Sequence, residues 1–255
     1  MSRGIDGTFF EIHHHNTAEG KYWNPALDSF TAENWREKVR EIAALKMEYI
    51  VVMATALYDR CYFESSVFPL ADIPCADPIE AVLDEADKCG ISEVIDRSFK
   101  AMDELTEKYA RHKSFYGWYF PDETCIILRF SGNFMKYVNL CSARCREITP
   151  DKKTLIAPYG TNLALTNSKY IDALASLDVD FIAYQDEIGV KKTRVWQSEK
   201  IFARLKKAHD KAGRAALWAD IELFKFEGMV YKSALLPADF ERIERQIANV
   251  APYAD

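Results

Sequence analysis

The chain has 255 residues, of which 49% are hydrophobic, so it is long enough and apolar enough to bury a large core. Its formal net charge of -6, without any Lys/Arg stripe in the sequence, argues against nucleic acid as a partner. No apolar run reaches about 18 residues, so we expect no membrane span. The oligomeric state is left open.

Six cysteines occur in the chain, and no two of them form a C-x-x-C pair. A disulfide scaffold is not expected in a chain of this length with so rich a core. The first residues form no hydrophobic leader segment. We therefore expect reduced thiols and a cytoplasmic protein, and the alternative is an exported protein whose leader is not part of the sequence.

Short apolar runs predict β-strands that alternate with amphipathic helices. Most of these runs are continuously apolar, which is typical of parallel strands covered on both faces. The strands are expected at residues 8–12, 49–55, 115–120, 154–159, 180–185 and 215–222. The helices are expected at residues 32–46, 78–89, 93–109, 133–147, 167–177, 198–212 and 238–249. Thr31 and Ser198 are expected to begin helices, and Gly90 and Gly213 to end them.

The alternation of strand and helix at intervals of roughly 25–40 residues is typical of an α/β fold, either a (β/α)8 TIM-type barrel or a doubly wound sheet. No G-x-G-x-x-G or Walker loop follows any strand, and polar residues follow several different strands, so we favour the barrel. We expect one barrel domain over residues 1–255. The barrel is expected to be irregular or incomplete at strands three and eight, because only residues 90–94 hint at a third strand and the chain ends after the last helix.

Two of the expected strands end in carboxylates. The run 115–120 stops at Pro121 and is followed by Asp122 and Glu123, and the run 215–222 ends with Glu222. The carboxyl ends of the strands of a parallel barrel meet at one rim, so both glutamates would face the same site. A pair of carboxyl groups at such a rim is what acid-assisted cleavage of a glycosidic bond requires.

The sequence resembles a family of bacterial TIM-barrel proteins with a domain of unknown function, allied to the clan-A retaining glycoside hydrolases. The resemblance covers nearly the whole chain and is carried by residues 115–123, 184–190 and 218–224, and more weakly by residues 237–246. In the allied clan the acid/base glutamate follows strand four and the nucleophile follows strand seven, which implies these roles for Glu123 and Glu222. Asp122 departs from the pattern, because the clan usually has asparagine there.

The surroundings of the two glutamates suggest how their roles would differ. The aromatic run that precedes Glu123 would desolvate its carboxyl group, raise its pKa and favour the acid role. Glu222 would then attack the anomeric carbon as the nucleophile. The alternative is that both glutamates are solvated loop residues or ion-pair partners.

Other acids near strand ends are candidates for binding a hydroxyl-rich substrate. Asp186 and Glu187 follow the run 180–185, and Asp186 is also a fallback catalytic carboxylate. The alternative is that both are acids at the entry of a helix, where they favour its dipole.

The histidines after the first strand form a second group of candidates. On an extended chain Glu11, His13 and His15 share one face, and His14 points away. These three could hydrogen-bond a sugar, bind a metal or serve the fold. Aromatic rings at strand ends could stack on sugar rings. The candidate substrate-binding residues are Glu11, His13, His15, Trp23, Tyr58, Trp118, Asp122, Tyr159, Gln185, Asp186, Glu187, Trp218 and Asp220.

The leading hypothesis is a glycoside hydrolase-like enzyme that cleaves an O-glycosidic bond by a retaining mechanism, with Glu123 and Glu222 as the catalytic carboxylates. Its partner would be a carbohydrate or a small-molecule glycoside, and neither a cofactor nor a bound metal is expected. One alternative is a metal-dependent sugar isomerase or epimerase, and another is a carbohydrate-binding barrel without catalysis. The sugar, the anomer and the linkage are left open.

Overall fold

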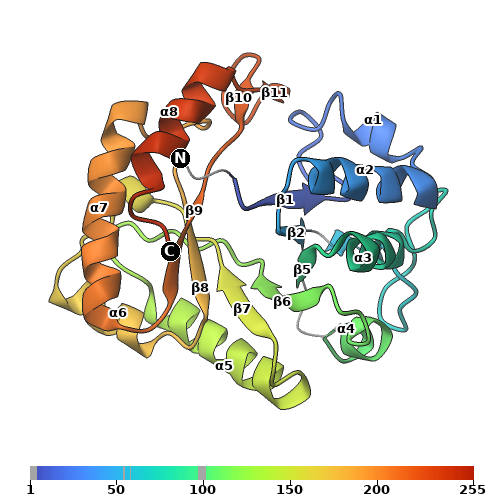
Figure 1. Cartoon of the computed structure of the whole chain (residues 1–255), viewed down its shortest axis with the longest axis horizontal. Coiled ribbons are helices and arrows are strands. Elements are labelled where there is room, and N and C mark those ends of the chain that lie inside the picture. Colours follow the sequence, from blue (N-terminus) through green and yellow to red (C-terminus); the bar gives the residue numbers. More distant parts are fainter. Residues whose placement is uncertain (1–4, 54, 58, 97–101) are drawn as a thin grey trace. The chain divides into compact units, whose positions relative to one another are not determined.

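The computed structural model describes residues 5–53, 55–57, 59–96 and 102–255, which form two compact units (Figure 1). Among these residues, the N-terminal unit comprises 5–121 and 145–152, and the C-terminal unit comprises 122–144 and 153–255. Tyr58, a candidate from the sequence, lies outside the described residues. The expectation of a single domain over residues 1–255 remains a prediction.

A parallel sheet forms the centre of the N-terminal unit. Its strands are β1 (Gly7–Glu11), β2 (Tyr49–Met53), β5 (Ser92–Asp96) and β6 (Phe115–Phe120). The order of these four strands is β1–β2–β5–β6, and each neighbouring pair is parallel. The register pairs Gly7 with Tyr49, and a Cβ atom on Gly7 would clash with the tyrosine ring, so the backbones approach closely where β1 begins.

Four helices belong to this unit, and their ends follow the capping rules. They are α1 (Asn24–Leu27), α2 (Ala32–Ala44), α3 (Pro78–Cys89) and α4 (Met102–Tyr109). The side chain of Thr31 accepts a hydrogen bond from the backbone N–H of Asn34 at the start of α2, as expected. Gly90 ends α3 with a left-handed φ of 70°, also as expected. The helices α2 and α3 pack against each other, and Trp35 and Val39 of α2 are buried.

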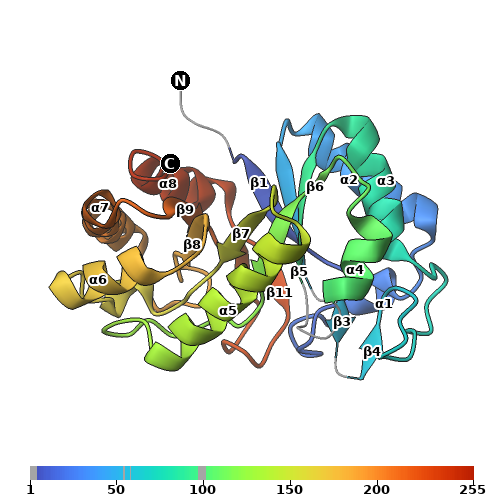
Figure 2. The same cartoon turned by 90° about the horizontal axis from the view of Figure 1, so that it is seen from below.

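Parallel strands also form the centre of the C-terminal unit. They are β7 (Lys153–Ile156), β8 (Phe181–Gln185) and β9 (Ala216–Asp220), in that order. The helices are α5 (Gly132–Ile148), which begins in this unit, α6 (Ser168–Ser176), α7 (Val195–Ala212) and α8 (Phe240–Val250), with a 3-10 turn η2 (Thr161–Leu163). The helix α7 contacts α6, α8 and β9 (Figure 2).

A buried polar chain fixes β8 to its helices. The Tyr184 hydroxyl lies 2.9 Å from the hydroxyl of Tyr170 on α6 and 2.9 Å from Nε2 of His209 on α7. The other ring nitrogen of His209 lies 2.9 Å from the carbonyl oxygen of Ala215, just before β9. Every polar atom of this chain therefore has a partner, and the side of β8 that carries Tyr184 faces the helices.

Two short antiparallel hairpins were not expected from the sequence. The first pairs β3 (Ala56–Leu57) with β4 (Arg60–Cys61), and the second pairs β10 (Phe224–Phe226) with β11 (Leu235–Pro237). With two or three residues in each strand, neither hairpin shows the period-two alternation that identifies a strand from sequence.

The structure confirms an α/β fold with parallel strands and corrects two of the expected elements. The helix expected at 93–109 is wrong in its first part, because residues 92–96 form β5 and pair with β2 and β6. A register shift between Glu93 and Val94 makes this third strand irregular, as expected. Ser198 is not a helix cap, because α7 begins at Val195 and the Ser198 hydroxyl donates to the Val195 carbonyl. Closure into an eight-stranded barrel remains a prediction.

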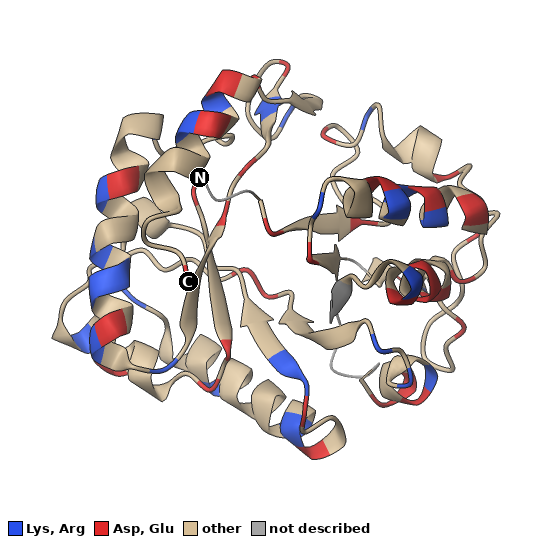
Figure 3. Ribbon diagram, viewed as in Figure 1, with Lys and Arg blue, Asp and Glu red and all other residues tan. Residues whose placement is uncertain are grey.

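Acidic and basic residues alternate along α2 and α8 (Figure 3). On α8 the acids Glu241 and Glu244 are interspersed with Arg242 and Arg245. Mixed charge of this kind is typical of helix faces exposed to solvent.

Candidate functional site

The candidate acids of the C-terminal unit follow two neighbouring strands. The register pairs Gln185, the last residue of β8, with Asp220, the last residue of β9. Asp186 follows directly after β8, and Glu222 lies two residues beyond β9. Because the carboxyl ends of adjacent parallel strands lie side by side, the fold brings these acids together, as the sequence predicts.

Asp186 is almost completely buried and has a full set of hydrogen-bond donors. Its Oδ2 accepts from Nε2 of Gln246 on α8 at 2.6 Å, and its Oδ1 accepts from the backbone N–H groups of Ile188 and Glu222 at 3.1 and 3.3 Å. Burial raises the pKa of Asp186 to about 6 in spite of these donors. Asp186 therefore changes protonation close to neutral pH.

Glu222 lies beneath the loop that follows β8. Its side chain is buried, and its Oε2 accepts from the backbone N–H of Val190 at 2.8 Å. A Cβ atom on Gly189 would lie 2.8 Å from the same oxygen, so the loop can pass this close only with glycine there. Burial and the neighbouring Asp186 raise the pKa of Glu222 to about 8. Glu222 is thus protonated at neutral pH.

Asp220 and Glu123 complete this group of acids. Burial, followed by repulsion from Glu222, Glu123 and Asp186, raises the pKa of Asp220 well above its usual value. Glu123 contributes to this repulsion, and its own side chain is exposed. The four acids come from the segment after β6 and from the ends of β8 and β9.

The expected desolvation of Glu123 is therefore wrong, and Glu222 is the desolvated glutamate. The strand β6 ends at Phe120, and residues 121–123 are exposed, so the aromatic run before Glu123 is buried without taking the carboxyl group with it. Asp122 is exposed in the same segment.

Glu187 has a structural environment. It is completely buried, its Oε2 accepts from the backbone N–H of Thr161 at 2.9 Å, and its Oε1 lies 3.5 Å from Nζ of Lys192. The same Lys192 ammonium lies 4.9 Å from the centre of the Tyr159 ring, close enough for a cation–π contact. Gln185 donates to the carbonyl of Ala157 at 3.3 Å. These contacts connect the loop after β8 to the segment after β7.

The tryptophans expected near strand ends have different environments. Trp118 is completely buried, and its indole N–H donates to Thr149 at 2.8 Å, so the expectation that it stacks on a sugar is wrong. It is a core residue because five of the six positions of β6, including this one, are buried. Trp218 stacks on Phe181 with ring centroids 4.1 Å apart and remains partly exposed.

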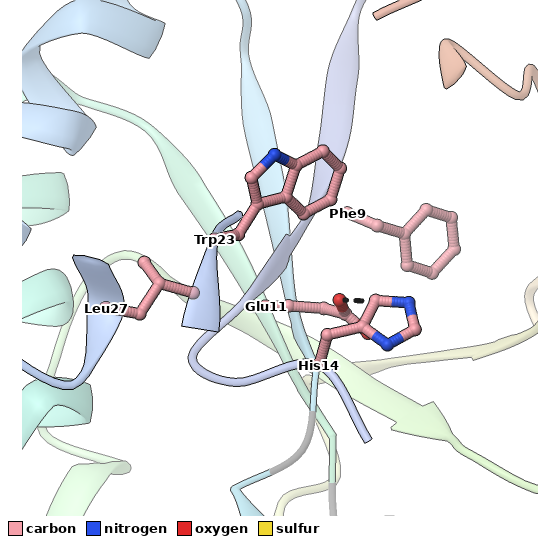
Figure 4. A pocket seen from close by; sticks show the side chains of 5 residues that line it. All are labelled: Phe9, Glu11, His14, Trp23 and Leu27. Carbon is pink, nitrogen blue, oxygen red and sulfur yellow. Dashed lines mark ion pairs between the residues drawn. The ribbon is translucent and has the colours of Figure 1, made fainter. Parts of the chain in front are cut away.

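In the N-terminal unit, a cavity of about 240 Å³ lies beside the end of β1 (Figure 4). Its lining residues are Phe9, Glu11, His14, Trp23 and Leu27. Glu11 and Trp23, both predicted from the sequence, are thus next to each other, and the Trp23 side chain is 39% exposed. An exposed indole beside a carboxylate suits a ligand with one apolar face and several hydroxyl groups.

The histidine that joins Glu11 is His14, which the alternation of an extended chain had placed on the opposite side. His14 is buried, and its Nε2 lies 3.9 Å from Glu11 and 3.6 Å from Glu19. The chain turns directly after β1, so the two-residue alternation ends there. His13 lies 3.5 Å from Asp28 instead.

His15 is exposed at the surface and stacks on the His14 ring. Burial, followed by the nearby His15 and His13, lowers the pKa of His14 to about 4, so its ring is neutral at pH 7.

Two groups of side chains among the described residues have ligand atoms within 4.8 Å of one another, as a metal ion requires. They are Glu11 with His14 and His15, and Glu80 with Asp84 and His112. Neither group contains the acids of the C-terminal unit.

Residues 5–101 and 91–255 match the model of a family described as a domain of unknown function, DUF4434. The chain belongs to this family. No curated protein matches the sequence. The family match confirms the resemblance to a family of unknown function that the sequence suggested.

Solved structures of glycosidases have a similar fold. The β-glucuronidase 2 of Bacteroides uniformis is 12% identical with a TM-score of 0.53, covering 99% of this chain and 29% of that one. The endo-β-1,4-mannanase of Thermotoga petrophila is 9% identical with a TM-score of 0.53, covering 98% and 76%. An FMN-binding β-glucuronidase from Facaelibacterium prausnitzii L2-6 is 14% identical with a TM-score of 0.50, covering 85% and 30%.

At these identities the likeness concerns the fold alone, which resembles that of TIM-barrel glycoside hydrolases. The chain spans less than a third of the length of the two glucuronidase chains. In the described part of the chain, no helix is long and apolar enough to cross a membrane.

Two residues of α8 contact the acids and were not recognised from the sequence. Gln246 donates to Asp186, and the guanidinium of Arg242 donates to the backbone carbonyls of Glu222 and Phe224 at 2.7 and 2.8 Å. In the sequence, only their spacing of four residues could indicate this role, because it puts both side chains on one face of an amphipathic helix.

Proposed function

We propose that this chain is a glycoside hydrolase-like enzyme that cleaves an O-glycosidic bond with Glu123 and Glu222. The observation that carries the proposal is the group of acids at the strand ends, in which one glutamate is buried and protonated near neutral pH and the other is exposed. Cleavage of a glycosidic bond needs one carboxyl group that donates a proton and a second, ionised one on the other side of the bond.

The environments of the two glutamates indicate which one holds the proton. With its pKa raised to about 8, Glu222 carries a proton at pH 7. We therefore propose Glu222 as the proton donor and Glu123 as the ionised partner, the reverse of the roles that the resemblance implies. Asp186, which accepts a hydrogen bond from the Glu222 backbone N–H, has a pKa raised to about 6. It would help to restore the proton on Glu222 after each cleavage.

Two further features support a carbohydrate as the substrate. The fold resembles that of enzymes named as glucuronidases and a mannanase. The cavity beside β1 offers the exposed Trp23 ring and the Glu11 carboxylate, which suit a sugar ring. Asp220 and Trp218 on β9 and Tyr159 after β7 remain proposed substrate contacts.

The test is turnover of aryl glycosides, including β-glucuronides and β-mannosides, with good and with poor leaving groups. A proton donor matters most for poor leaving groups. Glu222→Gln should therefore reduce kcat for poor leaving groups by about 10²–10⁴-fold and affect good ones far less, whereas Glu123→Gln should abolish turnover of both.

The exposed Glu244→Gln on α8 is the matched control and should leave turnover unchanged. The opposite pattern for the two glutamates would restore the roles implied by the resemblance. Binding of sugars with no turnover of any aryl glycoside would refute the enzyme and favour a carbohydrate-binding protein.

A further inference from the structure

His112 is a buried histidine whose two ring nitrogens both face carboxylates. It lies between α4 and β6, and only 5% of its surface is exposed. Its Nδ1 lies 3.1 Å from Oδ2 of Asp87, and its Nε2 lies 3.2 Å from Oε2 of Glu80. Both acids belong to α3. This arrangement is separate from the acids of the C-terminal unit and independent of the proposed function.

A neutral imidazole has one N–H group, so it can donate to only one of the two carboxylates. The backbone N–H of Ser114 donates to the other oxygen of Asp87 at 2.6 Å. Asp87 thus already accepts one hydrogen bond from the backbone, and its second oxygen lies within hydrogen-bond distance of Nδ1. With the Nδ1–H group donating to Asp87, the lone pair of Nε2 faces Glu80.

Asp84 offers a third possible metal-binding side chain close to Glu80 and His112. Asp84 is four residues after Glu80 on α3, so the two carboxylates lie on one face of the helix. One ligand atom each from Glu80, Asp84 and His112 lies within 4.8 Å of the others. Ligand atoms bound tetrahedrally to zinc at about 2.0–2.2 Å lie about 3.4 Å apart, so these side chains need only a small adjustment to close around an ion. The guanidinium of Arg111 contacts Oε1 of Glu80, which leaves Oε2 for the shared position.

We propose that Glu80, Asp84 and His112 bind a divalent transition-metal ion, with Asp87 as the residue that orients the imidazole. One imidazole and two carboxylates form a donor set that suits zinc, and a carboxylate on the second ring nitrogen is the usual support of a metal-bound histidine. The ion would connect α3 to the segment that leads into β6.

The competing arrangement has a doubly protonated His112 that bridges Asp87 and Glu80 without an ion. In that arrangement the Asp84 carboxylate does not contact His112. Asp84→Asn therefore separates the two arrangements and leaves the contacts of Asp87 in place.

The experiment is titration of the chelator-treated full chain with ZnCl2 by calorimetry, followed by thermal unfolding with and without ZnCl2. We expect one zinc ion to bind at this site in the wild type, and zinc at about 100 times its Kd to raise Tm by about 5–10 °C. Asp84→Asn and His112→Asn should each weaken binding at least about tenfold and remove the rise in Tm.

Two matched variants complete the test. Glu107→Gln removes an exposed carboxylate from α4 and should bind zinc as the wild type does. His15→Gln changes the second group of ligand atoms, at Glu11 and His14, and should also keep the site. Zinc binding that survives Asp84→Asn unchanged, disappears in His15→Gln, or is absent from the wild type would overturn the proposal.

Discussion

Substitution of Glu222 by glutamine should change how the stability of the chain depends on pH. Burial and the neighbouring Asp186 raise the pKa of Glu222 from 4.5 to about 8 in the folded chain. The folded state therefore holds this proton more tightly than the unfolded state does. The corresponding stability is fully present below the unfolded pKa of 4.5 and is lost as the pH rises through about 8.

The size of the effect follows from the same two pKa values. At about 1.4 kcal/mol per pH unit, the rise from 4.5 to about 8 corresponds to an upper limit of about 5 kcal/mol in the free energy of unfolding. Asp186, whose pKa is raised from 3.8 to about 6, adds a loss of the same sign at lower pH. Asp220, whose pKa is also raised, contributes in the same direction. Glutamine stays neutral, so Glu222→Gln should remove the part of the pH dependence that comes from Glu222.

The assay is urea unfolding of the wild type and Glu222→Gln at about pH 5 and about pH 8. The wild type should lose stability between the two, and the variant should lose at least about 2 kcal/mol less. Glu244→Gln, an exposed change on α8, should follow the wild type. Equal pH dependence in the wild type and Glu222→Gln would refute the raised pKa, and with it the reason for naming Glu222 as the proton donor.

Three further substitutions test the packing around the acids and the core. Gly189→Ala should destabilise the chain by about 1–3 kcal/mol in urea unfolding, because the new methyl group would lie 2.8 Å from Oε2 of Glu222. Gln246→Ala removes the 2.6 Å hydrogen bond to Asp186 and should raise the pKa of that carboxyl group further, as NMR titration would show. Trp118→Phe should lower Tm, because this ring is completely buried, and should leave KM unchanged for any glycoside whose turnover the proposed activity allows to be measured; a change in KM alone would contradict its place in the core.

Much of the fold could be predicted from local pattern. The strand 115–120 and the helix 78–89 have the bounds expected, because a continuous apolar run and a capped amphipathic face are both local signals. The helix predicted for 93–109 is wrong in its first residues, because their apolar pattern fits both the helical and the strand period. Pairing with β2 and β6 makes them a strand. The short hairpins carry too few residues for any period to appear.

The candidate site was predictable in its positions but not in its environments. The strand ends identify Glu123, Asp186 and Glu222 without a structure. Which glutamate is desolvated depends on the loop after β8, which covers Glu222, and on Gln246, which reaches Asp186 from 60 residues away in the sequence. Contacts of that separation leave no periodic signal, and the sequence alone therefore favours Glu123 as the protonated carboxyl group.

Two buried acids, Asp186 and Glu222, and the partly buried Asp220 lie at neighbouring strand ends, which is energetically unfavourable and is not required by the fold. Asp186, Asp220 and Glu222 all have raised pKa values because burial penalises their ionised forms. Backbone N–H groups and Gln246 offset part of this penalty, yet an apolar side chain in the same space would avoid it altogether. Buried titratable groups that repel one another, gathered where parallel strands end, are a typical arrangement of enzyme sites. The energetic cost of keeping these acids at the strand ends favours a catalytic over a purely structural role for them, and the leaving-group experiment decides between the two.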